Sequence, residues 1–289
     1  IDSVSPTITI TSATVSDGSA SNDESISLTF TSSEVTTNFV ESDITVTGGS
    51  LSNFSATSST VYTATFMPSE AGATTIDVLG GVFTDQAGNS NTASSQFNWT
   101  FDNSSAQLSD VSLVSNNTTT TLAKVGDTIT LSFTANETIT PTVNFSSGES
   151  SIESNRVSMT NTSGNTWTAT YTAGSNDTDG AVAYSIEFSD SVGNAGAPVT
   201  SGTGSVTFDK TSPIISITSA TVDNGGATNS ESILVTFTAS EATTTFDITD
   251  INVSGGELSN FSGEGTEYSA IFSPTGDGVK TIDIDAGVN

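Results

Sequence analysis

Acidic residues recur at corresponding places in three related segments of this 289-residue sequence. In the first segment, Glu34 follows an alternating apolar run, Asp85 lies in a Gly-Asn turn, and Asp102 follows an aromatic run. Carboxylates placed together repel one another unless a cation lies between them. Ca²⁺ takes six to eight oxygen ligands, including carboxylates, carbonyls and Asn side chains. The pattern therefore predicts a calcium site at the end of each segment.

The predicted ligands form one set per segment. They are Glu34, Asp85, Asn89 and Asp102; Glu137, Asp190, Asn194 and Asp209; and Glu241, whose set lacks its later members. The alternative is that Asp85 and Asp190 only close Asx turns and that the Glu side chains are hydrated. The residues alone leave both interpretations open.

A second acidic group lies between two predicted strands. Its members are Asp17, Asn22, Asp23 and Glu24, echoed by Asp223, Asn224 and Glu231. A further cation site is conceivable here, but a polar turn explains the group equally well, and we favour the turn.

The composition excludes several classes of function. The chain has 32 acidic and 4 basic residues, a formal charge of −28, no Cys and no His. Phosphate backbones would repel such a chain, so we expect no nucleic-acid partner. Without His or Cys, the common nucleophilic triads cannot form. The four basic residues are isolated from one another, so no phosphate-binding cluster is visible either. We therefore expect that the protein is not an enzyme. No apolar run approaches the ~18 residues of a membrane span.

Internal repeats set the predicted domain organisation. Thr29–Glu34 returns as Thr236–Glu241, with a weaker form at Ser132–Glu137, and Ile10–Val15 returns as Ile217–Val222. Self-similarity at a spacing of about one hundred residues indicates tandem units. We predict three domains, at residues 1–102, 103–209 and 210–289, with the third incomplete at its C-terminal end.

Alternation of apolar and polar residues predicts the elements that position these carboxylates. Phe97, Trp99 and Phe101 define an inner face, and no stretch has helical periodicity. About seven short strands per hundred residues are typical of an immunoglobulin-like sandwich. We therefore expect an all-β protein of three tandem immunoglobulin-like β-sandwiches in a linear array. In the first repeat the predicted strands are Thr7–Thr14, Ser25–Ser32, Asp43–Thr47, Ser50–Ser55, Val61–Met67, Thr74–Phe83 and Gln96–Phe101.

Three short motifs carry a family resemblance: Thr-Phe-Thr-x-Ser-Glu, Phe-Thr-Asp-x-Ala-Gly-Asn, and a Phe-Asp-x-x-x-Pro junction. Together they resemble the bacterial immunoglobulin-like repeats of large surface adhesins and envelope proteins. The resemblance implies extracellular, tandem, rod-like arrays, often with Ca²⁺ stiffening the junctions. The junction Asp102-Asn-Ser-Ser-Ala106 departs from the pattern because it lacks the Pro.

These observations predict an extracellular structural spacer, a segment of an adhesin stalk, surface layer or fibre. Its partners would be neighbouring repeats of the same chain, with self-assembly into a fibre or layer as a further expectation. The alternative is an adhesion module that binds a glycan or a host-surface receptor through loops at one pole. Exposed aromatic residues in the loops of one repeat would favour that alternative, and both Trp residues instead fall in strand patterns.

Overall fold

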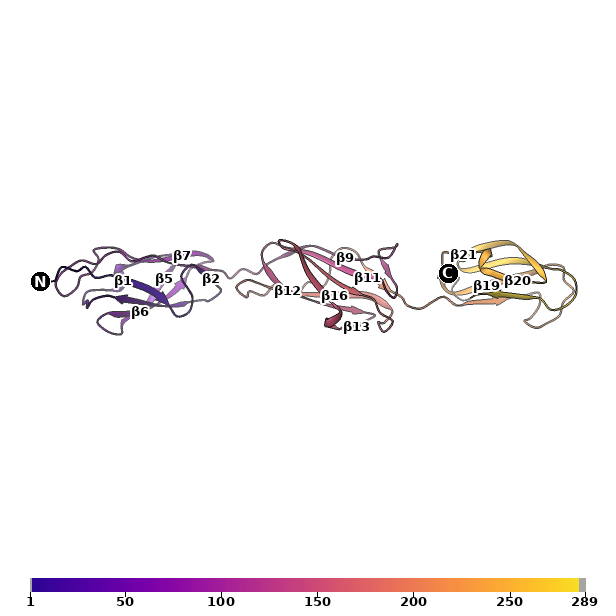
Figure 1. Cartoon of the computed structure of the whole chain (residues 1–289), viewed down its shortest axis with the longest axis horizontal. Coiled ribbons are helices and arrows are strands. Elements are labelled where there is room, and N and C mark those ends of the chain that lie inside the picture. Colours follow the sequence, from indigo (N-terminus) through magenta and orange to yellow (C-terminus); the bar gives the residue numbers. More distant parts are fainter. Residues whose placement is uncertain (1, 286–289) are drawn as a thin grey trace. The chain divides into compact units, whose positions relative to one another are not determined.

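The computed structural model describes residues 2–285 and is built from β-strands and three short 3₁₀ turns (Figure 1). By its internal contacts the chain divides into two compact units, Ile1–Asp209 and Lys210–Asn289, which we describe separately. The buried apolar residues form three clusters, two in the first unit and one in the second. The all-β prediction is thus confirmed, whereas independent folding of three repeats stays a prediction.

The first repeat is a sandwich of two four-stranded sheets, in the orders β1-β3-β6-β5 and β2-β8-β7-β4. Successive residues of a strand face opposite sides of the sheet. Apolar residues at alternate positions therefore give each sheet one apolar face, and the two apolar faces pack together as a sandwich. The strands are β1 (Ile8–Ser12), β2 (Ser19–Ser21), β3 (Ile26–Ser32), β4 (Ile44–Thr47), β5 (Gly49–Ala56), β6 (Val61–Pro68), β7 (Gly72–Val78) and β8 (Phe97–Phe101).

Two details of this repeat differ from the sequence prediction. Strand β7 ends at Val78 rather than Phe83, because the chain turns at Gly81, whose φ of 82° suits glycine. The loop that follows is held by Asn91, whose Oδ1 accepts hydrogen bonds from the backbone N–H groups of Val82 and Phe83 at 2.9 and 3.1 Å. Strand β2, which pairs in parallel with β8, is too short and polar to predict from alternation.

Aromatic side chains fill the core of the first repeat. Trp99 packs edge-on against Phe66, with ring centroids 6.1 Å apart. Phe39 packs in a similar way against Tyr62 at 5.0 Å, and the buried Tyr62 hydroxyl donates a hydrogen bond to the carbonyl oxygen of Thr36 at 3.0 Å. Truncation of a fully buried ring such as Phe30 would cost roughly 3–5 kcal/mol.

The second repeat has the same two layers, with sheet orders β14-β15-β11-β9 and β10-β17-β16-β12-β13. Its longest strand, β16, crosses the sandwich from one pole to the other and carries Asp190 at its C-terminal end. The strands are β9 (Leu108–Ser115), β10 (Leu122–Ala123), β11 (Thr128–Ala135), β12 (Ile139–Ser147), β13 (Ser150–Ser151), β14 (Ser158–Ser163), β15 (Thr166–Thr172), β16 (Gly180–Asp190) and β17 (Val206–Phe208).

In the second unit, the described residues form sheets β18-β19-β21 and β20-β22. Its core copies that of the first repeat: Phe246 and Tyr268 have ring centroids 5.1 Å apart, and the Tyr268 hydroxyl donates to the carbonyl oxygen of Thr243 at 3.0 Å. The strands are β18 (Ile215–Thr218), β19 (Ile233–Thr243), β20 (Ile251–Ser254), β21 (Gly256–Pro274) and β22 (Thr281–Ile284).

The sequence predicted no helix, and within residues 2–285 the structure adds only the three 3₁₀ turns Glu41–Asp43, Ser154–Arg156 and Ile248–Asp250. Two of them are closed by an aspartate that accepts a backbone hydrogen bond: Asp43 from Val40 and Asp250 from Asp247, both at 2.9 Å. Short polar side chains favour such local turns. No helix within residues 2–285 is long and apolar enough to cross a membrane.

Candidate metal centres

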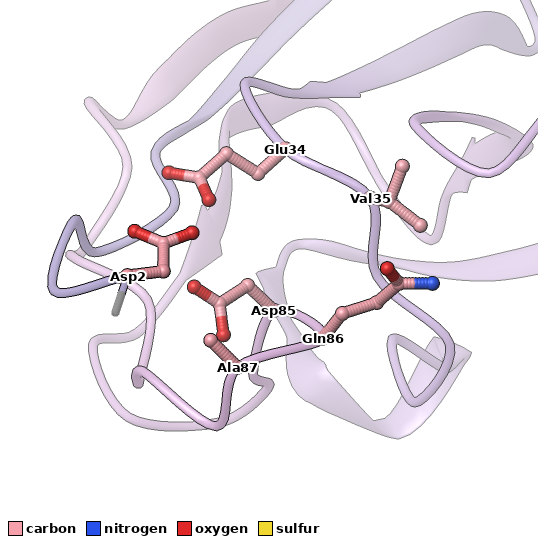
Figure 2. A pocket seen from close by; sticks show the side chains of 6 residues that line it. All are labelled: Asp2, Glu34, Val35, Asp85, Gln86 and Ala87. Atoms are coloured by element: carbon pink, nitrogen blue, oxygen red, sulfur yellow. The ribbon is translucent and has the colours of Figure 1, made fainter.

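Two clusters of three carboxylates lie at corresponding places in the first two repeats. The first, here called the leading cluster, consists of Asp2, Glu34 and Asp85, and one oxygen of each lies within 4.8 Å of the others. Figure 2 shows the three carboxylates directed toward one another across an open pocket of about 340 Å³. Asp85 is buried, Glu34 is half-buried and Asp2 is exposed.

The second cluster, here called the junction cluster, consists of Asp102, Glu137 and Asp190. One carboxylate oxygen of each again lies within 4.8 Å of the others. Each member corresponds in position to one of the leading cluster. Asp102 and Asp2 lie in the segment that leads into a repeat, Glu137 and Glu34 follow the central strands β11 and β3, and Asp190 and Asp85 begin a Gly-Asn loop. Both clusters therefore combine two carboxylates of a repeat with one from the incoming segment.

The prediction that Asp102 joins Glu34 and Asp85 is wrong. Phe101 pairs with Gly72 at the start of β7, whereas Asp85 lies beyond the other end of that strand, so Asp102 and Asp85 occupy opposite poles. Asp209 likewise lies apart from Asp190, because Phe208 pairs with Gly180 at the start of β16. At about 3.3 Å per residue, the length of β16 places these poles about 33 Å apart.

Asp2 is the ligand candidate that the sequence prediction missed. A signal for it was present, since Asp2-Ser-Val-Ser-Pro6 repeats Asp209-Lys-Thr-Ser-Pro213 and so marks an incoming junction. By the same correspondence Asp209 matches Asp2, and Glu241 matches Glu34. Asp209 closes the first unit and Glu241 lies in β19 of the second.

The two predicted asparagine ligands hold the buried aspartates in place. Asn89 donates to both Asp85 carboxylate oxygens, from its backbone N–H and its Nδ2, each at 2.8 Å. Asn194 makes the same pair of bonds to Asp190 at 2.9 and 2.8 Å. Asp190 Oδ1 also accepts the N–H groups of Val192 and Gly193. A direct ligand role for either Asn stays a prediction.

These bonds set the charge state of the clusters. The Asn89 side chain and neighbouring N–H groups hold the pKa of Asp85 below its ordinary value, against the effect of burial. Burial alone would raise the pKa of Asp190, but the bonds from Asn194 and the loop backbone outweigh it and lower the pKa. Both aspartates are therefore ionised at neutral pH.

The pKa of Glu34 shifts in the opposite direction. Burial, followed by the negative charges of Asp2 and Asp85, raises the pKa of Glu34 above its ordinary value. A nearby anion disfavours the charged form of a carboxyl group, and a nearby cation favours it. The carboxylates of the leading cluster therefore repel one another, and a bound divalent cation would reduce this repulsion.

The segment around Asp102 is bonded to both repeats of the first unit. The Asp102 N–H donates to the Ser21 carbonyl oxygen at 3.0 Å, and the Asp102 carbonyl oxygen accepts from Asn194 Nδ2 at 3.0 Å. Asn22 Nδ2 of the first repeat donates to Asn194 Oδ1 at 3.2 Å. Ser105 Oγ donates to the Ala195 carbonyl oxygen at 2.8 Å. The junction is thus hydrogen-bonded without the Pro that the sequence pattern led us to expect.

The second acidic group of the first repeat, around Asp17 and Asp23, forms a hydrogen-bonded turn. Asp17 Oδ1 accepts the N–H of Asn98 at 2.8 Å, and Asp23 Oδ2 accepts the hydroxyl of Ser21 at 2.7 Å. These bonds tie the turn to strands β2 and β8, which supports the turn interpretation over a further cation site.

The paired sheets of the successive repeats place this chain in the class of tandem β-sandwich proteins. The family described as bacterial Ig-like domain matches residues 2–101 and 209–288, more than half of the chain. The protein therefore belongs to the bacterial Ig-like domain family, and the resemblance seen in the sequence is confirmed. The divergent second repeat lies outside the matched residues.

Among solved structures, the I-band fragment I67–I69 of titin is 11% identical with a TM-score of 0.44, covering 96% of this chain and 90% of that one. A marsupial T cell receptor has 11% identity, a TM-score of 0.40 and coverages of 98% and 97%. Invasin, a bacterial integrin-binding protein, has 15% identity, a TM-score of 0.34 and coverages of 96% and 56%. No curated protein matches the chain.

Proposed function

We propose that this chain is a structural spacer of an extracellular bacterial protein, in which tandem Ig-like repeats set the distance between other parts. Membership of the bacterial Ig-like family supports this role. The surface supports it as well, because none of the large hydrophobic side chains exposed within residues 2–285 is aromatic. A glycan-binding or receptor-binding module would be expected to present such rings at its loops.

The finer part of the proposal is that Ca²⁺ binds the leading and junction clusters and stiffens the first unit. The observation that carries it is that each cluster joins two carboxylates of one repeat to a third from the incoming segment. A cation held by all three would fix that segment to the repeat. Hard oxygen donors of this kind favour Ca²⁺ over softer metals, and the backbone carbonyls nearby could complete its shell.

Self-assembly of copies into a fibre or layer is a further part of the proposal. Incoming segments and repeat poles are similar along the chain, as Asp2 and Asp102 show. A head-to-tail contact between copies gives a filament where its rotation does not close into a ring.

The test of stiffening uses spin labels. The sequence has no Cys, so Cys introduced at Ser69 in the first repeat and at Ser163 in the second gives a clean pair of labels at exposed positions. We expect the distribution of distances between the labels to narrow when Ca²⁺ replaces chelator. In the double variant Asp102→Asn, Glu137→Gln, the distance distribution should not narrow when Ca²⁺ replaces chelator. Equal distributions in Ca²⁺ and chelator would refute stiffening and leave the spacer role to be judged by binding assays.

A further inference from the structure

The first repeat has a second pocket, which shares no residue with the acidic clusters. It has a volume of about 160 Å³ and lies between β1, the edge strand of one sheet, and the start of β8 in the other sheet. Ile8, Ile10 and Phe97 form its apolar part, and Asp17 and Gln96 belong to its polar part. We call this space the edge pocket.

The edge pocket exists because β2 is short. Strand β2 pairs with β8 only from Trp99 onward, so Phe97 has β7 on one side and no strand on the other side within residues 2–285. The turn at Asp17 and Gly18 takes that place. The Gly18 N–H donates to the Asn98 carbonyl oxygen at 2.7 Å, and Asp17 Oδ1 accepts the Asn98 N–H at 2.8 Å. A turn covers less of the core than a strand does, and the pocket is the space that it leaves.

The exposed carboxylate of Asp17 has an oxygen left over at the rim of this pocket. Asp17 Oδ1 accepts the backbone hydrogen bond, whereas Oδ2 accepts none among the described residues. Residues 1–102 contain no Lys or Arg, so the first repeat supplies no cation for this charge. The turn does not require the charge either, because Asn224 and Gly225 of the second unit correspond to Asp17 and Gly18. The two glycines have φ angles of 78° and 77°.

We propose that the edge pocket binds a lysine side chain on an extended segment of a partner protein. Lysine combines an apolar four-carbon stem with a charged end, and it buries the stem while the ammonium stays near polar groups. The stem would lie against Ile8, Ile10 and Phe97, and the ammonium would meet Asp17 Oδ2 at the rim. A cavity of about 150 Å³ admits a group of the size of benzene, so the edge pocket has room for one such stem.

Charge and hydrogen bonding favour lysine over other occupants. The formal charge of −28 attracts a cationic partner and repels both an anionic partner and a second copy of the chain. Arginine binds carboxylates best through two parallel hydrogen bonds, but Asn98 already occupies one oxygen of Asp17, and the remaining oxygen suits a compact ammonium. An aromatic side chain would fill the space and leave the charge of Asp17 without a partner. This recognition is independent of the acidic clusters and of calcium.

The experiment titrates the peptide acetyl-Ala-Lys-Ala-amide, at physiological salt, into the chain of residues 1–289 with isotope-labelled isoleucine methyl groups. We expect saturable shifts of the Ile8 and Ile10 methyl signals. The signals of Ile44, in the same core, and of Ile217, near Asn224 in the second unit, should not change. A norleucine peptide keeps the stem without the ammonium and should bind about threefold more weakly. A diaminopropionic acid peptide keeps the ammonium on a shorter stem and should bind at least about tenfold more weakly.

A charge-removing variant tests the role of Asp17. Asp17→Asn keeps an oxygen for the Asn98 N–H, and it should make the lysine and norleucine peptides bind equally. Glu70→Gln is the matched control, since Glu70 is an exposed acid of the same repeat outside the pocket, and it should leave the threefold preference for lysine unchanged, within about a factor of two. The peptide comparisons on the wild-type chain need no variant, so they test the proposal even where Asp17→Asn lowers stability.

Each other outcome overturns the proposal. Unchanged Ile8 and Ile10 signals would show that the edge pocket does not accept the side chain. Equal binding of the lysine and norleucine peptides to the wild-type chain would show that the carboxylate is not recognised. Equal losses in Asp17→Asn and Glu70→Gln would reduce the binding to general attraction by an acidic chain. The same shifts at high protein concentration without peptide, with a dimer on gel filtration, would show that a second copy occupies the pocket.

Discussion

Replacement of Asp102 by Asn should have opposite effects in chelator and in calcium. Asp102 contributes one of three carboxylates that lie within 4.8 Å of one another. Two unit charges at this separation repel by about 0.9 kcal/mol at the dielectric constant of water, and removal of Asp102 eliminates two such pairs. Physiological salt screens part of this repulsion. In chelator, Asp102→Asn should therefore raise the free energy of unfolding of the second repeat by about 1 kcal/mol.

In calcium the same substitution removes a ligand. With free Ca²⁺ at about 100 times its Kd, the bound site adds about 2.7 kcal/mol to the native state. If the loss of one carboxylate weakens binding about tenfold, the calcium increment falls to about 1.4 kcal/mol. The diagnostic result is therefore a variant that is more stable than wild type in chelator and gains about half as much from calcium.

The assay is urea unfolding of the full chain in EDTA and in CaCl₂, with calorimetric titration of Ca²⁺ into wild type and variant. Glu187→Gln is the matched control, since Glu187 is exposed on the same strand as Asp190 but lies outside the cluster. A variant that is less stable in chelator, with an unchanged calcium increment, would refute the reasoning. It would assign Asp102 a purely structural role through its Ser104 hydrogen bond.

Three further predictions concern stability, each measured by chemical unfolding. Arg156→Ala should cost about 3 kcal/mol, because Asp177, whose side chain is only 3% exposed, loses its bidentate partner and stays buried; a loss below about 1 kcal/mol would contradict this. The pKa of Asp127 is held low, chiefly by the Asn117 side chain, so this contact stabilises the fold above the unfolded pKa near 3.9 and is lost as pH falls through the lower folded pKa. Asn117→Ala should cost about 1 kcal/mol at pH 7 and reduce the loss of stability on acidification below the unfolded pKa, and an unchanged pH profile would be evidence against it. Gly49→Ala should cost about 1–3 kcal/mol, since a Cβ there would lie 2.4 Å from the Met67 carbonyl oxygen, whereas Gly80→Ala, with its nearest neighbour at 3.4 Å, should be tolerated; equal effects would rule out the steric explanation.

The sequence was sufficient to predict the sandwich because its strands are strictly patterned. In β3, Ile26, Leu28 and Phe30 alternate with polar residues, and all three are buried. Strand β2 escaped prediction because its three small polar residues, Ser19–Ser21, form a strand only through pairing with β8, which is far away in sequence. Strand β7 was predicted too long because Val82 and Phe83 continue its apolar pattern into a loop.

Five of the six carboxylates in the two clusters were predicted from the sequence, whereas Asp2 was missed and the predicted grouping was wrong. Glu34 and Asp85 could be paired, since both follow strands that end at the same pole. Asp102 was assigned to the wrong repeat because the end of a strand in sequence does not state at which pole it lies. That depends on strand direction, and β8 runs antiparallel to β7. The partner of Glu34, Asp2, is marked only by its junction motif.

The parallel pairing of β2 with β8, and of β10 with β17, has a mechanical consequence. Strands β8 and β17 are the last strands of the first two repeats, and each runs beside its partner, β2 or β10, in the same direction. A pull on the two ends of the chain would slide one strand along the other and load the hydrogen bonds between them in shear, all at once. A force in a different direction would be needed to break these hydrogen bonds one after another. This pairing therefore suits the first two repeats to resist a force applied along the chain.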